Sequence, residues 1–318
     1  MISIVIPCYN EEEVLPQLCA RLGAAAETWG EEYEIILVDD GSRDGTWRLI
    51  REQHARDGRW RGISFARNFG HQTAISAGIH HAKGDAVVVM DADLQDPPEQ
   101  LGRFIAAWKE GNEVVYAIRA TRKENFLKRA AYKSFYRILR SLANIEIPLD
   151  SGDFCLMDRR VVNVLKAMPE RNRFVRGLRS WAGFRQIGLE YNRDARAAGE
   201  VKYTFRKLIK LALDGVVSFS TTPLRMATYL GFGVSILALF GAAFTILQRI
   251  FVDWFTRIGF PYVPGFYTLF TGILFLGGVQ LICLGIIGEY LGRIFDEVKG
   301  RPLWTIRETA GLEIGETR

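Results

Sequence analysis

Short apolar runs alternate with longer amphipathic stretches over the first 120 residues of the chain. The runs are continuously apolar, and the stretches between them carry apolar residues at helical spacing. Five strands are predicted at residues 2–7, 34–38, 62–65, 86–90 and 113–118, and four helices at residues 11–29, 44–57, 71–82 and 98–110. Continuously apolar strands that alternate with helices are typical of an α/β fold with a mainly parallel sheet covered on both faces.

A less regular pattern follows over residues 124–195. It predicts helices at 125–143 and 159–168, and a polar, glycine-containing turn at 150–154. Residues 205–219 then place apolar side chains on one side of a predicted helix and basic side chains on another. A helix of this kind is suited to lie in the plane of a membrane interface.

Two stretches nearer the C-terminal end contain no charged residue. Residues 226–248 are uncharged over 23 positions, and residues 259–288 over 30. Each exceeds the roughly 20 residues that a helix needs to cross a bilayer, so two membrane spans are predicted. The expected organisation is a large domain at 1–200, an amphipathic juxtamembrane segment at 201–225, a two-helix membrane domain at 226–290 and a tail at 291–318, loosely ordered from 305.

Basic residues flank the predicted spans on both outer sides. They outnumber acids between residues 202 and 225, and Arg293, Lys299, Arg301 and Arg307 follow the second span. Cytoplasmic flanks carry such an excess, which predicts a two-span protein of the inner (plasma) membrane with its large domain and both termini in the cytoplasm. The first residues lack the basic segment and cleavage site of a secretory signal, which agrees with this orientation.

Net charge and cysteine content narrow the possible partners. The formal net charge of +5 has its excess beside the spans, which fits an anionic membrane surface or anionic substrates rather than nucleic acid. The four cysteines show no metal-ligand spacing and are expected to be small buried residues in a reducing compartment.

The fourth predicted strand ends in Asp91-Ala92-Asp93-Leu94-Gln95-Asp96. Carboxylate and amide oxygens are ligands for Mg²⁺ or Mn²⁺, and Mg²⁺ usually combines one or two carboxylates with substrate phosphates. The motif therefore suggests a nucleotide-diphosphate substrate, although Asp-rich strand ends also occur in turns and helix caps.

Two more polar clusters follow strands of the same predicted sheet. Pro7-Cys8-Tyr9-Asn10 follows the first strand, and Asp39-Asp40-Gly41-Ser42 the second. In parallel sheets ligands bind beyond the carboxyl ends of the strands, so the clusters predict one site. The carboxylates of the second cluster suit the ribose hydroxyls and base of a nucleoside. The alternative is a strand-to-helix turn capped by Ser42 or Asp44, and the two interpretations are compatible.

Basic and acidic residues elsewhere are candidates for the same site. Four of them are candidate phosphate ligands: Arg119, Arg122, Arg196 and Lys202. Taken singly, each is more typical of a solvated surface charge, and Arg119 has the best case because it follows the fifth strand at the same edge as the Asp clusters. Asp153 is either a general base or a residue that orders its turn. The histidines at 71, 80 and 81 have no matching ligand spacing and are expected to line or cap helices.

The ordered motifs at residues 4–11, 38–42 and 91–99 resemble those of the family 2 glycosyltransferases with a GT-A fold. Residues 151–154, 196–203 and 285–293 extend the resemblance to the polyisoprenyl-phosphate glycosyltransferases, the group that contains dolichyl-phosphate mannose synthase and bactoprenol-phosphate glucosyltransferases. One departure is Val201, where the family usually carries a hydroxyl residue before the lysine.

The resemblance implies a GT-A (Rossmann-like, mainly parallel sheet) catalytic domain followed by amphipathic interface helices and two transmembrane helices. It assigns roles by position: metal ligands Asp91, Asp93 and Gln95; nucleoside contacts Pro7, Tyr9, Glu11, Asp39 and Asp40; phosphate contacts Arg119, Arg196 and Lys202; and catalytic acids Asp153 and Asp93 near the sugar. It also implies a homotetramer and a UDP-sugar donor. The Gln-x-x-Arg-Trp motif of processive synthases is absent from the sequence.

The predicted reaction is inverting transfer of glucose from UDP-glucose to a polyisoprenyl phosphate such as undecaprenyl phosphate. Transfer of mannose from GDP-mannose, or of an N-acetylhexosamine or aminoarabinose derivative from UDP, is the alternative within the same class. A membrane-anchored nucleotide-sugar sensor is an alternative of another class. A dinucleotide-dependent oxidoreductase would need Gly-x-Gly-x-x-Gly after the first strand, and residues 7–11 do not provide it.

Overall fold

The computed structural model describes residues 1–119, 151–171, 173–191, 221–259 and 265–313. The chain forms two compact units, which are described separately. One unit, the sheet domain, contains Met1–Gly215 together with Arg301–Arg318, and the other, the helical hairpin, contains Val216–Gly300.

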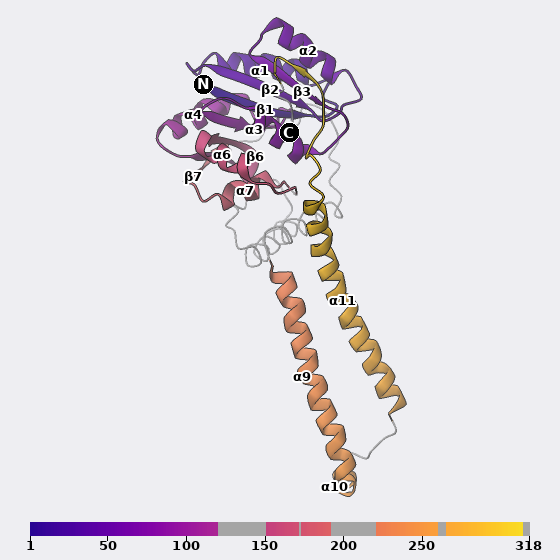
Figure 1. Cartoon of the computed structure of the whole chain (residues 1–318). Coiled ribbons are helices and arrows are strands. Elements are labelled where there is room, and N and C mark those ends of the chain that lie inside the picture. Colours follow the sequence, from indigo (N-terminus) through magenta and orange to yellow (C-terminus); the bar gives the residue numbers. More distant parts are fainter. Residues whose placement is uncertain (120–150, 172, 192–220, 260–264, 314–318) are drawn as a thin grey trace. The chain divides into compact units, whose positions relative to one another are not determined.

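The described part of the sheet domain is built on an eight-stranded sheet with strand order β7-β5-β6-β4-β1-β2-β3-β8 (Figure 1). The strands are β1 (Ile2–Cys8), β2 (Tyr33–Asp39), β3 (Trp60–Phe65), β4 (Ala86–Val89), β5 (Val114–Arg119), β6 (Ser151–Asp158), β7 (Gln186–Tyr191) and β8 (Ile306–Ala310). β6 runs antiparallel to β4 and β5, and β8 runs antiparallel to β3, whereas the other pairs are parallel. The predicted α/β fold with a mainly parallel sheet is confirmed.

Helices flank the sheet and bury its strands. They are α1 (Leu15–Ala26), α2 (Thr46–Arg56), α3 (His71–His81), the 3₁₀ helix η1 (Pro98–Gln100), α4 (Leu101–Lys109), α6 (Arg159–Ala167) and α7 (Val175–Trp181). Every residue of β1 and β2 is buried, as expected for strands covered on both faces. α3 packs so closely on β1 that a Cβ on Gly78 would lie 2.2 Å from Val5 Cγ1, so only glycine fits there.

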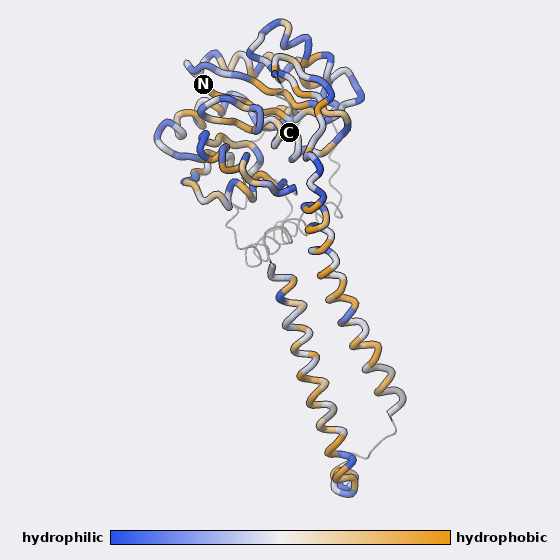
Figure 2. The backbone as a smooth tube through the Cα atoms, viewed as in Figure 1, coloured by the Kyte–Doolittle hydropathy of each residue, from blue (hydrophilic) through white to orange (hydrophobic). Residues whose placement is uncertain are grey.

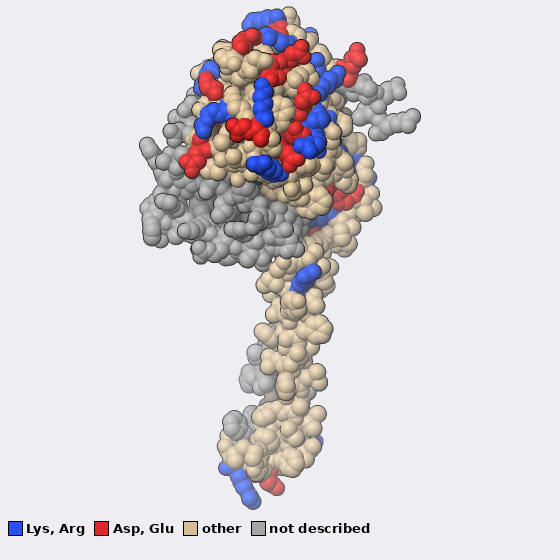
Figure 3. All heavy atoms as spheres, turned by 90° about the vertical axis from the view of Figure 1, so that its left-hand side faces the viewer, with Lys and Arg blue, Asp and Glu red and all other residues tan. Residues whose placement is uncertain are grey.

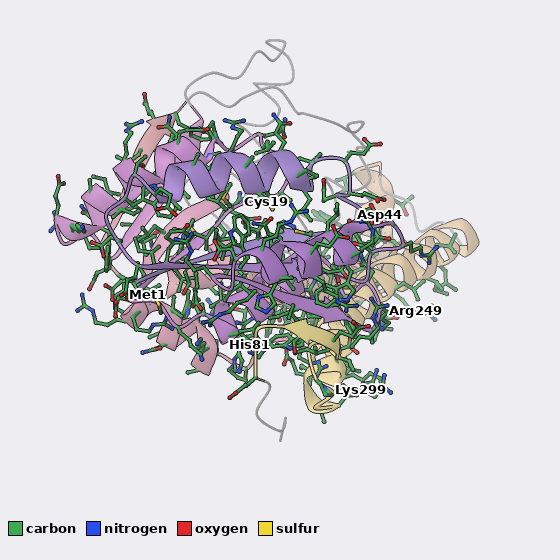
Figure 4. All side chains as sticks on the ribbon, turned by 90° about the horizontal axis from the view of Figure 1, so that it is seen from above. Met1, Cys19, Asp44, His81, Arg249 and Lys299 are labelled. Carbon is green, nitrogen blue, oxygen red and sulfur yellow. The ribbon has the colours of Figure 1, made fainter. Side chains whose placement is uncertain are left out.

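Helix α1 begins at Leu15 rather than at residue 11, because the preceding residues are used in a loop-to-loop contact. Asn10 N donates to Ser42 Oγ at 2.9 Å, and Glu11 N donates to Thr46 Oγ1 at 2.9 Å. These bonds join the loop after β1 to the loop after β2. The carboxylate of Asp44 in the second loop (labelled in Figure 4) accepts a hydrogen bond from Glu12 N. This bond holds the end of the first loop.

Two sequence-based expectations are wrong. Residues 151–154 are not a polar turn, because they form the start of β6, where Val89 of β4 pairs with Cys155. The tail is not loosely ordered from residue 305, because β8 pairs with β3 between Gly62 and Phe65. Both segments are held by partners distant in sequence, which a local pattern does not reveal.

The helical hairpin consists of α9 (Thr222–Ile250), α10 (Val252–Arg257) and α11 (Phe266–Val298). Figure 2 shows α9 and α11 to be predominantly apolar, and Figure 3 shows few charges along this part. Two segments, Thr222–Ile250 and Gly272–Val298, are long and apolar enough to cross a membrane, and their most apolar windows are 0% buried. Both helices extend beyond the uncharged stretches, since Arg225, Arg249 and Glu289 continue the helical backbone.

Candidate functional site

The carboxyl ends of the parallel strands and the starts of antiparallel β6 and β8 lie at one edge of the sheet. Val89 pairs with Cys155, so Asp91, two residues beyond Val89, is level with Asp153, two residues before Cys155. The register thus places two carboxylates from segments 62 residues apart beside each other. The predicted convergence of polar clusters at this edge has a structural basis in the strand directions.

Asp153 lies at the centre of a charged cluster. Its Oδ2 accepts a hydrogen bond from Gln72 Nε2 at 3.0 Å, and its Oδ1 accepts one from Arg176 Nη2 at 3.3 Å. His71 Nε2 lies 3.6 Å from Asp153 Oδ2 and 3.4 Å from Asp91 Oδ1. The imidazole therefore lies between the two carboxylates, and residues from α3, α7 and β6 converge on one point.

Asp91 is the member of this cluster whose charge is least compensated. Desolvation raises the pKa of Asp91 to about 6; His71 opposes the rise, and the carboxylates of Asp153, Asp96 and Asp93 add to it. A raised carboxylate pKa means that the ionised form is disfavoured by its surroundings. A cation bound here would relieve that excess of negative charge.

Asp153 has the opposite environment. Burial alone would raise its pKa, but hydrogen bonding to His71 and the charge of the Arg176 guanidinium hold the pKa of Asp153 well below its ordinary value. Desolvation would lower the pKa of His71, but the hydrogen bond to Asp153 and the charge of Asp91 raise it above its usual value. Asp153 is thus a stable carboxylate and a weak base, paired with an imidazole that favours its charged form.

The residues after β4 suit a divalent cation only in part. Asp91 Oδ1 is buried and makes no hydrogen bond among the described residues, although His71 Nε2 lies 3.4 Å from it. Asp93 Oδ1 accepts from Gln95 N at 3.1 Å, which orders the turn. No three His, Cys, Asp or Glu side chains in the described ranges form a metal site by themselves. The assignment of Asp91, Asp93 and Gln95 as metal ligands stays a prediction, in which a substrate would supply further oxygen ligands.

Asp96 connects the turn after β4 to β7, the strand at one end of the sheet. It is buried and accepts a hydrogen bond from the hydroxyl of Tyr191, the last residue of β7. Leu94 has a φ of 57°, an unusual value for a branched residue that indicates a tightly constrained turn. These contacts hold the segment between Asp91 and Asp96 at the sheet edge.

The second part of the site is formed by the loops after β1 and β2. Tyr9 is 44% exposed, whereas Pro7 belongs to β1 and is buried. Asp39 is 0% exposed; its Oδ1 accepts from Ser42 N at 2.9 Å and its Oδ2 from Ser64 Oγ at 2.7 Å. The buried Asp39 carboxylate thus holds the loop after β2 through Ser42. Its contact with a nucleoside stays a prediction.

Asp40 also has a defined structural task. Its carboxylate accepts from Phe69 N at 2.6 Å and from Gly70 N at 2.9 Å. These are the residues that lead into α3, so Asp40 fixes the position of His71 at the start of that helix. Desolvation raises the pKa of Asp40, and the two backbone donors oppose that rise.

Other predicted residues fall at or beyond the limits of the described chain. Arg119 ends β5 opposite Tyr191, at the same edge as Asp91 and Asp153, but its side chain is not described. Arg122, Arg196 and Lys202 lie outside the described residues, as do the predicted helices at 125–143 and 205–219. Their roles stay predictions.

Sequence reasoning missed His71, Gln72, Arg176 and Arg179 as site residues. Arg179 is 1% exposed, and its Nε and Nη2, like Arg176 Nε, make no hydrogen bond within the described ranges. His71 carried a usable signal, since it follows the third strand as Arg119 follows the fifth. The two arginines carried none, because α7 reaches Asp153 only through the tertiary fold.

The chain is similar to known proteins over nearly its whole length. Residues 3–165 match the family described as Glycosyl transferase family 2, and residues 222–294 match the GtrB C-terminal hairpin. The "Uncharacterized glycosyltransferase YkcC" of Bacillus subtilis (strain 168) is 45% identical over 98% of this chain and 94% of its own length. The "SfII prophage-derived bactoprenol glucosyl transferase" of Shigella flexneri is 43% identical over 97% and 98%. The solved mannosyltransferase PcManGT from Pyrobaculum calidifontis, in complex with GDP-Man and Mn²⁺, is 16% identical over 91% of this chain and 86% of its own, with a TM-score of 0.46.

Proposed function

The chain belongs to glycosyl transferase family 2 and is a glycosyltransferase, and from this premise we propose that it transfers glucose from UDP-glucose to a polyisoprenyl phosphate. The observation that supports this acceptor is identity of 43% to a bactoprenol glucosyl transferase over nearly the whole of both chains. The match includes the helical hairpin, a region that a water-soluble acceptor would not require.

The donor would bind along the edge formed by the ends of β1, β2 and β4. Pro7, Tyr9, Glu11 and Asp39, with Asp40 behind them, would surround the nucleoside. Asp91, Asp93 and Gln95 would hold Mg²⁺ or Mn²⁺ with the diphosphate, and the ion would neutralise charge on the leaving group. The raised pKa of Asp91 supports this assignment, because burial and the neighbouring carboxylates disfavour its ionised form and a bound cation would favour that form.

The acceptor is already an anion at neutral pH. Its phosphate oxygen would attack the anomeric carbon as the bond to the nucleoside diphosphate breaks, with inversion at that carbon. No proton needs to be removed, and the lowered pKa of Asp153 makes this residue a poor base. We infer that Asp153 orients His71 and Arg176 toward the phosphates, so that catalysis depends on positioning and charge neutralisation.

The hairpin would keep the lipid acceptor within reach of the site. Its two apolar helices would cross the inner membrane, with the sheet domain and both termini in the cytoplasm. Arg119, Arg122, Arg196 and Lys202 would contribute phosphate contacts. A homotetramer is the assembly that we expect from the family resemblance.

The proposal is tested with the purified full-length chain in lipid nanodiscs. It is incubated with Mg²⁺, undecaprenyl phosphate and, in separate reactions, UDP-glucose, UDP-N-acetylglucosamine or GDP-mannose. Mass spectrometry of the lipid should show one added hexose with UDP-glucose. A product with another donor alone would correct the sugar, whereas nucleotide-sugar binding without any lipid product would indicate a sensor and contradict the proposal.

A further inference from the structure

We propose that Arg307, on the C-terminal strand β8, is a positioning residue for the nucleoside of the donor. The inference rests on the function proposed above, in which Asp39 lies in the nucleoside-binding part of the site. Arg307 belongs to the tail that follows the helical hairpin, some 270 residues from Asp39 in sequence. The fold nevertheless connects the two residues through a single side chain.

An irregularity in the strand pairing brings Arg307 to this position. Ser64 of β3 pairs with Glu308, but Phe65, the next residue, pairs with Ile306, so Arg307 is an extra residue in β8. Such a β-bulge redirects the side chain of the extra residue, and bulges of this kind are common beside active sites. The bulge lies opposite Ser64 and Phe65, the last two residues of β3. It is therefore at the carboxyl edge of the parallel strands, where the candidate site is.

The connection between Arg307 and Asp39 has a defined direction. Arg307 Nη2 donates to Ser64 Oγ at 3.0 Å, and Ser64 Oγ donates to Asp39 Oδ2 at 2.7 Å. A guanidinium has only donors, so Ser64 must accept from Arg307 and its single proton is left for Asp39. Without Arg307, the hydroxyl of Ser64 could rotate away from the carboxylate.

The effect extends from Asp39 to the exposed part of the site. Asp39 Oδ1 accepts from Ser42 N, and Ser42 Oγ accepts from Asn10 N, each at 2.9 Å. Asn10 follows Tyr9, and Asn10 Oδ1 in turn accepts from Arg43 N at 2.9 Å. One hydrogen-bonded chain therefore runs from β8 to the loops that would surround the nucleoside.

The tail is well anchored around Arg307, so the guanidinium is presented by a fixed strand. Ala66 N donates to Thr305 O at 2.9 Å, and Trp47 Nε1 donates to Glu308 Oε2 at 2.9 Å. The ring of Trp304 stacks on Phe65 with a centroid distance of 6.4 Å. Strand docking and the Arg307 contact can therefore be altered separately by mutation.

The test uses the full-length chain and four variants: Arg307→Met, Arg307→Lys, Ser64→Ala and the double variant of Arg307→Met with Ser64→Ala. Arg301→Met is the matched control, since it removes an exposed guanidinium from the same tail, six residues before Arg307, and leaves the ion pair between Arg307 and Glu308 in place. Binding of UDP with Mg²⁺ is measured by isothermal titration calorimetry. Values of kcat and of KM for UDP-glucose and undecaprenyl phosphate are measured alongside the melting temperature.

We expect Arg307→Met and Ser64→Ala each to weaken UDP binding and raise the donor KM about tenfold, the scale of a lost hydrogen bond to a charged group. The acceptor KM and kcat should stay within about twofold, and the double variant should bind no worse than either single one. Arg307→Lys, which keeps a donor, should recover part of the affinity. Arg301→Met should bind UDP like the wild type.

Three results would overturn the inference: unchanged UDP affinity in Arg307→Met, fully additive effects in the double variant, or equal changes in donor and acceptor KM. If Arg307→Met does not fold, Ser64→Ala and Arg307→Lys decide the question on the same criteria. A wild-type protein that transfers sugar while Arg307→Met binds UDP normally contradicts this inference alone. A wild-type protein that binds no nucleotide contradicts the proposed function and the inference together.

Discussion

The sheet domain and the helical hairpin place the same kinds of side chain in opposite environments. In the sheet domain Ile4 and Leu37 are 0% exposed, whereas Leu239 and Leu281 of the hairpin are each 71% exposed. The sheet domain excludes water from its apolar residues by covering both faces of the sheet. The hairpin leaves its apolar residues uncovered, as expected of helices whose surroundings are lipid.

Polar residues follow the same contrast. In the sheet domain Asp91 follows β4 and Asp153 lies in β6, and the two meet at one edge, where their pKa values shift in opposite directions. The most apolar windows of the hairpin contain at most two charged residues each. One region therefore concentrates charge at an edge of its sheet, and the other excludes charge from two helices that are long and apolar enough to cross a membrane.

The largest effect is expected when a charge is removed from the edge of the sheet domain. Asp91→Asn keeps the shape of the side chain but removes the charge that would hold the metal. We expect sugar transfer to fall about a thousandfold, or ~4 kcal/mol in the activation barrier. The measurement is the initial rate of lipid-linked hexose formation.

Asp85→Asn is the matched control, because Asp85 precedes β4 as Asp91 follows it and pairs instead with the N-terminal amine at 2.9 Å. Its rate should stay within about twofold of the wild type, since exposed ion pairs contribute little. Equal rates for Asp91→Asn and the wild type would remove Asp91 from the metal site.

The second test adds a charge to an apolar helix of the hairpin. Leu281→Arg places a charge in the middle of α11, which should cost about 3 kcal/mol on insertion into a membrane. We expect the variant to be lost from the carbonate-resistant membrane fraction, as measured by immunoblotting. Val298→Arg, at the end of the same helix, should remain in that fraction because the charge reaches the interface. Retention of both variants would show that α11 does not span a bilayer.

The third effect separates the stabilising role of Asp153 from catalysis. Asp153→Asn leaves His71 and Arg176 without their carboxylate, and we expect a loss of about 2 kcal/mol, or about 5 °C in Tm, at pH 7. Because the folded-state pKa of Asp153 is lowered, its contribution is fully present above the unfolded value of about 3.9 and is lost as pH falls below it. The difference in Tm between the wild type and Asp153→Asn should therefore be smaller near pH 3.5 than at pH 7. A difference that is constant with pH would contradict the assigned ionisation.

The smallest effect concerns charges away from the site. Arg21 makes a bidentate contact with Glu99 at 3.0 and 2.9 Å, but the two side chains are 30% and 51% exposed. Glu99→Gln should cost only about 0.5 kcal/mol, or roughly 1–2 °C in Tm, and leave the transfer rate unchanged. A loss as large as that of Asp153→Asn would show that the distinction between site and surface charges is wrong.

The parallel core could be predicted because its strands are recognisable from local sequence. Residues 86–89 are uninterrupted alanine and valine, and a strand so apolar must be covered on both faces. β7 and β8 could not be predicted in this way, since β7 is mostly half-buried and β8 is polar and short. Both are defined by their pairing with β5 and β3, and that pairing is a property of the whole fold.

The same reasoning explains which site residues the sequence could indicate. Asp91 and Asp93 follow a recognisable strand, so their position at the ligand edge could be predicted from general rules for parallel sheets. Arg176 and Arg307 come from α7 and β8, and they reach the site only after elements distant in sequence have packed. Their chemistry was visible in the sequence, but their location was not.

The most direct test of the account measures the binding of Mn²⁺ to the full-length protein by electron paramagnetic resonance. The measurement is made with and without UDP. Since no three ligand side chains in the described ranges form a metal site alone, the account predicts tight binding of one Mn²⁺ only when UDP is present, and its loss in Asp91→Asn. Equally tight binding without nucleotide, or normal binding in Asp91→Asn, would contradict the claim that this sheet edge holds a metal-bound diphosphate.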